Sequence, residues 1–149
     1  MGAIVYNDLS QNPQSDVIFD WDKMLAMEGN TAPYLLYALA RCRSLLRKAE
    51  DFEPGGLVLE HESERALALL ISRTPEVLLQ CASTWKTNAL ADHLYQLAGA
   101  LAAFWRDCPV YKDGVTPEQR QSRLTLAHAT SVAMSTGLRL LGLTPLERM

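Results

Sequence analysis

The side chains best suited to chemistry in this sequence are cations and aromatic rings. Four bases stand close together, at Arg41, Arg43, Arg47 and Lys48. Cationic side chains bind phosphates, and aromatic rings stack on unpaired bases. The aromatic candidates are Tyr34, Tyr37, Trp85, Tyr95, Trp105 and Tyr111. From the residues alone, the bases fit an ordinary exposed helix face and most of the rings fit a core or its boundary. The alternative is that the bases contact phosphates and the rings stack on unpaired bases of single-stranded RNA.

Trp105 stands out among the rings because of its place in a helical pattern. Apolar residues recur three and four positions apart at Leu90, Leu94, Leu97, Leu101 and Phe104. This spacing predicts one buried helix face, and Trp105 is turned about 100° away from it. The indole therefore sits at the predicted helix end beside Arg106. We expect a partly exposed stacking platform next to a base.

Patterns typical of catalysis are missing. The glycines build neither a dinucleotide fingerprint nor a phosphate-binding loop. The three cysteines form no CxxC pair, which argues against a disulfide framework and a zinc knuckle. We expect the acidic residues between 50 and 64 to be solvated, and each histidine to lie at the surface: His61, His93 and His128. The sequence predicts no metal site, and no catalysis by this chain alone.

Composition and charge describe a soluble domain. The 149 residues are 48% hydrophobic and 21% charged, without the run of about 20 apolar residues that a membrane helix needs. No signal peptide is visible, and the scattered cysteines suit a reducing compartment, so we expect a cytoplasmic protein. The net charge of −3 argues weakly against nucleic-acid binding. Residues 1–30 carry a net −4 and the remaining residues a net +1, which allows a local cationic face.

The last predicted helix organises the chain. Its apolar positions recur at helical spacing: Leu124, Ala127, Ser131, Met134, Leu138 and Leu141. Further apolar residues widen this face, so the helix is expected at the centre of a bundle. Gly142 then ends the helix, and Pro145 prevents its continuation.

Caps and breakers predict the other helices. Asn30 or Thr31 caps one helix, Thr74 before Pro75 starts another, and Thr116 starts the last. The predicted ranges are 20 or 22 to 27, about 31 to 49, 60 to 72, 74 to 85, 87 or 88 to 107, and 116 to 142. Residues 2–20 suggest a short helix or turn followed by a polar linker, with a brief extended stretch at 17–19. The fold expected is an all-α bundle of five or six helices, with residues 1–20 as an arm and 21–149 as the helical domain.

Two motifs carry a family resemblance. The run EGNTAPY-x-x-YA-x-AR spans Glu28 to Arg41, and the C-terminal stretch contains RL-x-L, then GL-x-LLGL, and ends in ERM. Together they resemble the C-terminal DALR-type anticodon-binding domain of class I arginyl-tRNA synthetases. The resemblance covers most of the chain, although residues 50–90 match only as a helical pattern. It implies docking of the anticodon stem-loop of arginine tRNA, whose anticodons share a central cytosine.

The resemblance also implies which residues contact the tRNA. Trp105 falls where the family has the tyrosine of a Phe-Tyr pair near the anticodon loop; tryptophan keeps a stacking face but only donates hydrogen bonds. Met149 corresponds to a terminal residue of the family's anticodon pocket, and Leu36 replaces a common glutamine. The full predicted tRNA-binding set is Trp105, Met149, Tyr34, Tyr37, Arg41, Arg47, Lys48 and Arg106.

The HIGH-type signature of the synthetase active site is missing from this sequence. The chain therefore resembles an excised C-terminal domain or a free-standing copy, with residues 1–20 as the link from a catalytic domain. ATP and Mg would belong to that catalytic domain, so no cofactor is expected here. The expected partners are the anticodon arm of arginine tRNA and the catalytic domain, in cis or in trans, without membrane or DNA. The alternative is a helical protein-interaction module that docks a separate catalytic chain through its acidic residues 1–30 and does not bind tRNA.

Overall fold

The computed structural model describes residues 2–12, 20–49 and 52–145. These ranges contain six helices and no strand, which confirms the all-α prediction. The helices are α1 (Gly2–Ser10), α2 (Trp21–Leu25), α3 (Ala32–Arg47), α4 (Glu62–Thr84), α5 (Asn88–Asp107) and α6 (Pro117–Leu140). No helix in this part of the chain has the length and hydropathy needed to cross a membrane.

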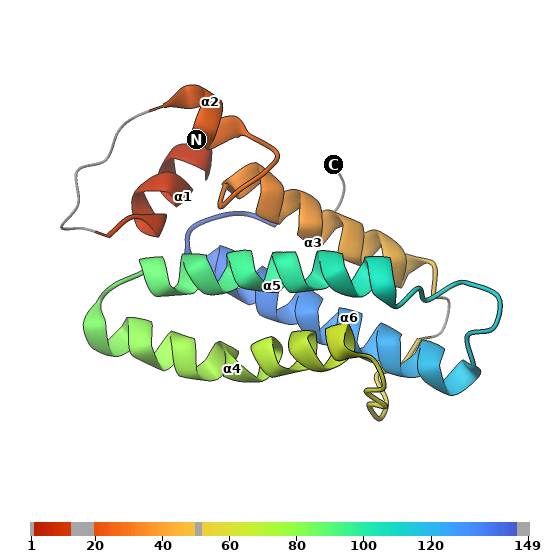
Figure 1. Cartoon of the computed structure of the whole chain (residues 1–149). Coiled ribbons are helices and arrows are strands. Elements are labelled where there is room, and N and C mark those ends of the chain that lie inside the picture. The colour runs from red at the N-terminus through yellow and green to blue at the C-terminus, as the bar shows by residue number, and fades with distance from the viewer. Residues whose placement is uncertain (1, 13–19, 50–51, 146–149) are drawn as a thin grey trace.

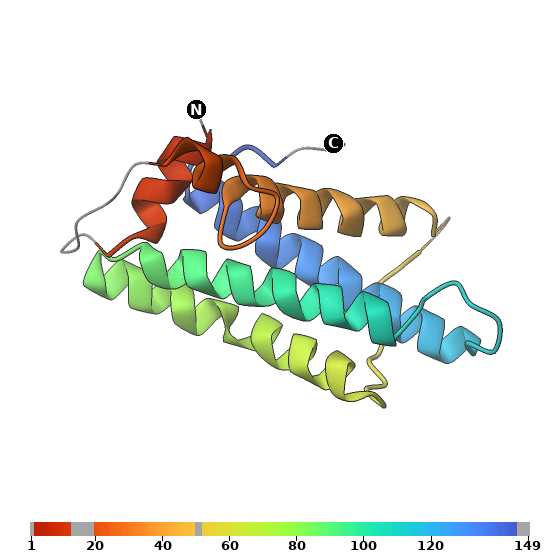
Figure 2. The same cartoon turned by 45° about the horizontal axis from the view of Figure 1, so that its top comes forward.

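The four long helices, α3 to α6, form a bundle with α5 and α6 at its centre (Figures 1 and 2). α6 packs against α3, α4 and α5, and α5 also packs against α1. The central position predicted for the last helix is therefore confirmed. α3 and α4 flank this pair on opposite sides, while α1 and α2 close the end of the bundle where α5 begins (Figure 1).

The predicted apolar stripes form the core. Every stripe residue of α5 is at most 3% exposed, from Leu90 to Phe104, and all six stripe residues of the last helix are buried. At the end of α6, Gly142 has φ +74°, and its N–H donates to the carbonyl of Arg139. The N–H of Leu143 reaches the carbonyl of Leu138, which completes a Schellman cap with Leu143 buried in the core.

The predicted helix caps are largely present. The hydroxyl of Thr31 accepts the N–H of Tyr34 at the start of α3, and Asp20 accepts backbone N–H groups at the start of α2. Thr116 and Gln119 form a capping box at the start of α6. Local sequence therefore fixes where these helices begin.

The predicted break at Thr74-Pro75 is wrong. α4 runs through both residues as one helix of 23 residues, which packs on α5 and α6. Thr74 is buried there, and its hydroxyl lies 2.9 Å from Nε2 of His93. His93 is only 4% exposed, so its predicted surface position is also wrong: the partner hydroxyl from α4 satisfies a ring that α5 turns into the core.

Glu64 likewise departs from the prediction that the acidic stretch is solvated. Its carboxylate is 2.7 Å from Nε of Arg123, and both side chains are largely buried. It also accepts the backbone N–H groups of Glu60 and His61, while Arg123 donates to the carbonyl of Pro109. This ion pair fastens the start of α4 to α6 and to the segment after α5, so it is a structural contact.

The first helix packs onto the bundle. Tyr6 is buried between α1 and α5, and its hydroxyl donates to the side chain of Asn30 at 2.5 Å. The hydroxyl of Thr87 donates to the carbonyl of Leu9. The extended stretch predicted at 17–19 lies outside the described residues.

Candidate nucleic-acid interface

One outward line of α3 collects four of the predicted site residues. Tyr34, Tyr37, Arg41 and Lys48 are spaced by three, four and seven residues, so they share one side of the helix. The opposite side holds the buried stripe that begins at Leu35. The pattern that buries one face of α3 thus presents aromatic rings and cations on another.

Trp105 of α5 meets this line at Arg41. The guanidinium carbon of Arg41 lies 4.9 Å from the centroid of the indole, a cation–π contact between the two helices. Trp105 is partly buried against the core, while Arg41 is exposed. The indole Nε1–H is shielded from solvent and has no acceptor among the described residues. The ring is therefore held by its packing and by Arg41 rather than by a hydrogen bond.

A groove of about 250 Å³ opens beside this pair. Arg41 and Lys48 line it from α3, Trp105 from α5, and Tyr111 from the segment that follows α5. The structure therefore brings three predicted site residues into one concave surface with two cations and two aromatic rings. A surface of this kind suits an unpaired nucleotide, because the rings offer stacking faces and the cations attract the phosphate.

Tyr34 and Tyr37 lie further towards the start of α3. Tyr34 makes an edge-to-face contact with Tyr95 of α5, with ring centroids 5.8 Å apart. Tyr37 is 44% exposed. They extend the line of aromatic side chains beyond the groove.

Arg106 and Arg47 do not line the groove. Arg106 forms two hydrogen bonds of 2.8 and 3.0 Å with Asp107, so its charge is already paired. The hydrogen bond from Arg106, together with one from Ser63, lowers the pKa of Asp107 to about 2. Arg47 follows Arg43 by one turn of α3, and Arg43 donates to Ser135 of α6, so Arg47 lies on the side of α3 away from Trp105. Met149 lies outside the described residues.

Sequence reasoning missed Arg120. Its guanidinium carbon lies 5.8 Å from the ring centroid of Tyr111, although Arg120 belongs to α6 and Tyr111 to the segment before it. Both residues line a second opening of about 270 Å³, together with Lys48. No local pattern signals this contact, because it depends on how the segment between α5 and α6 folds back.

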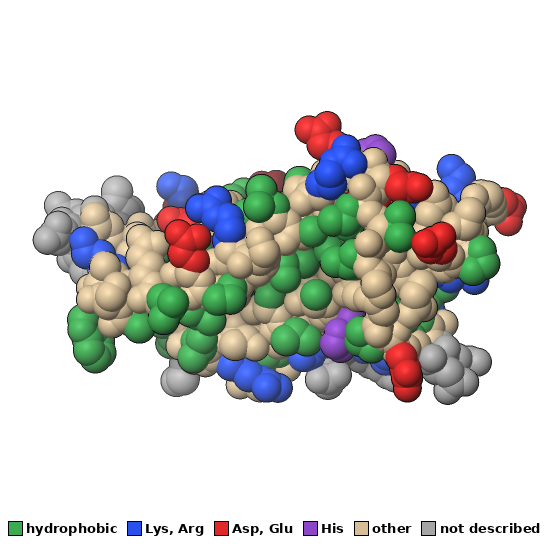
Figure 3. Space-filling model, turned by 90° about the horizontal axis from the view of Figure 1, so that it is seen from below, with side chains coloured by type: hydrophobic (Ala, Val, Ile, Leu, Met, Phe, Trp, Pro, Cys, Tyr) green, Lys and Arg blue, Asp and Glu red, His purple; other side chains and the backbone are tan. Residues whose placement is uncertain are grey.

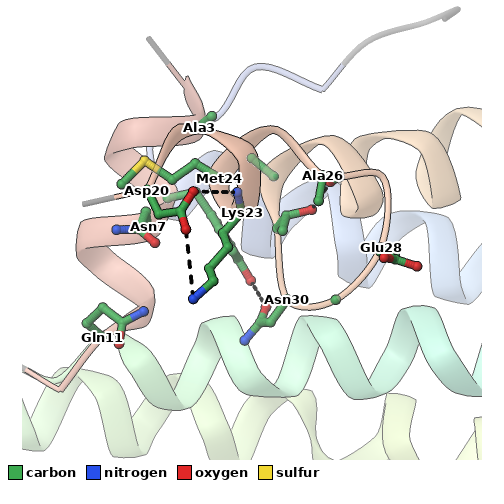
Figure 4. Close-up of a pocket in the computed structure, with 13 residues that line it drawn as sticks. Ala3, Asn7, Gln11, Asp20, Lys23, Met24, Ala26, Glu28 and Asn30 are labelled. Atoms are coloured by element: carbon green, nitrogen blue, oxygen red, sulfur yellow. Dashed lines mark hydrogen bonds and ion pairs between the residues drawn. The ribbon is translucent and has the colours of Figure 1, made fainter. Parts of the chain in front are cut away.

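A larger pocket of about 570 Å³ lies elsewhere, between α1, α2 and the turn before α3 (Figure 4). Some of its polar side chains bond within the protein: Tyr6 donates to Asn30, and Asp20 caps α2 and pairs with Lys23. The buried Nδ2 of Asn7, which also lines the pocket, has no acceptor among the described residues. None of the predicted site residues in the described ranges lines it. This pocket is a polar junction of the N-terminal helices and is separate from the groove.

Two further features bear on function. The side of the molecule seen in Figure 3 exposes hydrophobic side chains along much of its length. Exposed apolar residues on the outer faces of the long helices include Leu69 and Leu79 of α4 and Val132 and Leu140 of α6.

Among the described residues, no group of three or more histidine, cysteine or acidic side chains is arranged to hold a metal ion.

Comparison with known proteins gives one consistent family. Residues 35–149 match the DALR anticodon binding domain. The arginine–tRNA ligase of Shewanella denitrificans is 43% identical over 151 aligned residues, which cover the whole of this chain and 26% of that protein. The corresponding ligase of Fusobacterium nucleatum is 41% identical and is covered to 27%. The chain thus spans about a quarter of the length of these relatives.

Solved structures agree with the sequence relatives. The arginyl-tRNA synthetase of Plasmodium falciparum superposes with a TM-score of 0.88 and 32% identity, over 99% of this chain and 26% of that one. The Thermus thermophilus arginyl-tRNA synthetase gives the same TM-score, identity and coverage.

Proposed function

Because the chain belongs to the DALR anticodon-binding domain family, we propose that it is the tRNA-binding module of an arginyl-tRNA synthetase. In this role it docks the anticodon stem-loop of arginine tRNA. The aminoacylation chemistry, with its ATP and Mg, belongs to a catalytic domain that acts in cis or in trans. The module itself works in the cytoplasm and uses no cofactor.

The observation that carries the proposal is the groove formed by Arg41, Lys48 and Trp105. An unpaired base of the loop stacks on the indole, and the two cations bind the adjoining phosphates. Tyr34 and Tyr37 continue the contact along α3. Arg47 contributes long-range attraction rather than a contact in the groove, whereas Arg106 adds little because Asp107 pairs its charge.

The test is a titration of the whole chain with the arginine tRNA anticodon stem-loop, followed by tryptophan emission at low and moderate salt. A second RNA differs only at the central cytosine of the anticodon. We expect tighter binding of the cytosine loop at both salt concentrations, with affinity falling as salt rises. Equal affinity for both loops would mean that the chain makes only sequence-independent contacts with phosphates, and the proposal of anticodon recognition would fail.

A second candidate function is protein docking without RNA. The exposed apolar side chains on α4 and α6 favour it, because surfaces of this kind often contact other protein. On this alternative the chain docks a separate catalytic chain and binds neither stem-loop at low salt. The same titration therefore separates the two functions.

A further inference from the structure

We propose that the groove contains a second stacking position, at Tyr111, which receives the unpaired nucleotide next to the one on Trp105. This inference rests on the proposed function and adds a binding site to it. The ligand class is a single-stranded dinucleotide within an RNA loop. Tyr111 and Arg120 form the new position, and Lys48 links it to the first.

The two positions have the same construction. At the first, Arg41 lies over the ring of Trp105 at 4.9 Å, and at the second, Arg120 lies over the ring of Tyr111 at 5.8 Å. In each pair the ring comes from α5 or from the segment after it, and the arginine comes from a neighbouring helix. Each pair thus places an aromatic ring and a phosphate-binding cation together, and a base that stacks on the ring displaces the guanidinium from that face towards the phosphate.

Lys48 connects the two pairs. It lines the opening shared with Arg41 and Trp105 and also the opening shared with Tyr111 and Arg120. Tyr111 lines both openings as well, so they are adjacent. Two successive nucleotides are joined by one phosphate, and Lys48, which lines both openings, is the cation available to bind it.

Tyr111 is not needed to fill the core. Its neighbours Cys108 and Val110 are buried, whereas Tyr111 is 46% exposed. Partial burial raises the pKa of its phenol, so the side chain remains neutral near pH 7 and does not repel a phosphate. An exposed, neutral aromatic ring beside two cations is the chemistry that base stacking requires.

The experiment uses the full chain and anticodon stem-loops that carry 2-aminopurine at the nucleotide before or after the central anticodon position. Stacking quenches 2-aminopurine fluorescence. The proteins are the wild type, Tyr111→Ala, Tyr111→Phe and Trp85→Ala, the last as a control because Trp85 is 91% exposed at the end of α4 and lines neither opening. Circular dichroism melting checks that each variant folds.

We expect wild-type protein to quench one of the two labelled loops. Tyr111→Ala loses that quenching and weakens binding by about 5- to 150-fold, the usual value of one stacked base. Tyr111→Phe keeps both properties, since the ring face remains, and Trp85→Ala matches the wild type.

The outcomes separate this inference from the proposed function. Wild-type binding with cytosine preference, combined with unchanged affinity and quenching in Tyr111→Ala, would overturn the second position alone. Loss of quenching in Tyr111→Ala without any cytosine preference in the wild type would support the second position and overturn anticodon recognition. A wild-type protein that binds neither labelled loop would overturn both.

Discussion

The guanidinium of Arg41 rests over the indole of Trp105, at 4.9 Å from its centroid, and thereby joins α3 to α5 at the edge of the groove. In the free protein the cation covers a face on which a base could stack. The two side chains therefore form one recognition unit, in which ring and charge are positioned together.

Replacing Arg41 with alanine should weaken RNA binding mainly through charge. We expect the slope of log affinity against log salt to become shallower by about one unit, since one phosphate contact is lost. Thermal stability should change little, because a cation–π pair at an exposed site contributes only about 0.5–1 kcal/mol. Arg139→Ala is the matched control, since Arg139 is exposed at the end of α6 and does not line the groove. An unaltered salt slope in Arg41→Ala would show that this cation does not contact the RNA.

The buried pair of Glu64 and Arg123 should dominate stability at its end of the bundle. Arg123→Ala leaves the Glu64 carboxylate buried without its cation, so we expect a loss of about 3–5 kcal/mol in unfolding free energy, measured by urea denaturation. Arg106→Ala removes the exposed pair with Asp107 and should leave the urea midpoint almost unchanged. Equal midpoints for the two variants would contradict a structural role for the buried pair.

His93 should make the protein sensitive to mild acid. Burial, and then the nearby charge of Arg73, lowers its pKa in the folded state below the ordinary 6.5. The unfolded chain therefore takes up a proton first, so stability is complete above about pH 6.5 and falls as the pH drops towards the lower folded value. His93→Gln should flatten this fall below about pH 6.5 in a series of urea titrations, while lowering stability at pH 7.5. A wild-type slope retained in the variant would assign the effect to another group.

Glu64 acts in a second, more acidic window. Burial raises its pKa, but hydrogen bonds from the His61 N–H, Arg123 and the Glu60 N–H outweigh this and hold the pKa below the ordinary 4.5. Its contribution to stability is therefore present above that value and is lost as the pH falls through the lower folded pKa. The His93 variant should keep this second loss.

Gly137 lies directly against a side chain of α5. A Cβ at this position would lie 2.6 Å from a methyl carbon of Leu94, which is fully buried. Gly137→Ala gains about 1 kcal/mol of helix propensity but costs about 1–3 kcal/mol through overpacking, so we expect a net loss of about 1 kcal/mol. Gly99→Ala, on the exposed side of α5 with no atom near its Cβ, should instead raise the thermal midpoint. A higher midpoint for Gly137→Ala would mean that Leu94 has room to move.

Local patterns predicted most of the fold. The α5 stripe, the α3 and α6 caps and the glycine end of α6 each depend on residues a few positions apart. Pro75 misled the prediction, because packing on α5 carried the helix past a residue that usually interrupts it. The burial of His93 and Glu64 was not predicted for a related reason, since their partners Thr74 and Arg123 are distant in sequence.

The candidate site was likewise predictable where it depends on spacing within one helix, and not where it depends on contacts between segments. Helical spacing places Tyr34, Tyr37, Arg41 and Lys48 on one side of α3, and it could also have separated Arg47 from them. The contact of Arg120 with Tyr111 could not be predicted, because it depends on the path of the segment between α5 and α6. Arg106 and Asp107 are adjacent in sequence, but whether their charges pair depends on side-chain conformation and could not be predicted.

The most direct measurement of the central claim is the affinity of Trp105→Ala for a labelled anticodon stem-loop, by fluorescence anisotropy, beside Trp85→Ala. Both loops are used, with the central cytosine present or replaced, and circular dichroism verifies folding. We predict that Trp105→Ala folds, loses about 5- to 150-fold in affinity and no longer distinguishes the two loops, while Trp85→Ala behaves as the wild type. A folded Trp105→Ala with full affinity and intact cytosine preference would contradict the account, and an unfolded one would show that the ring belongs to the core.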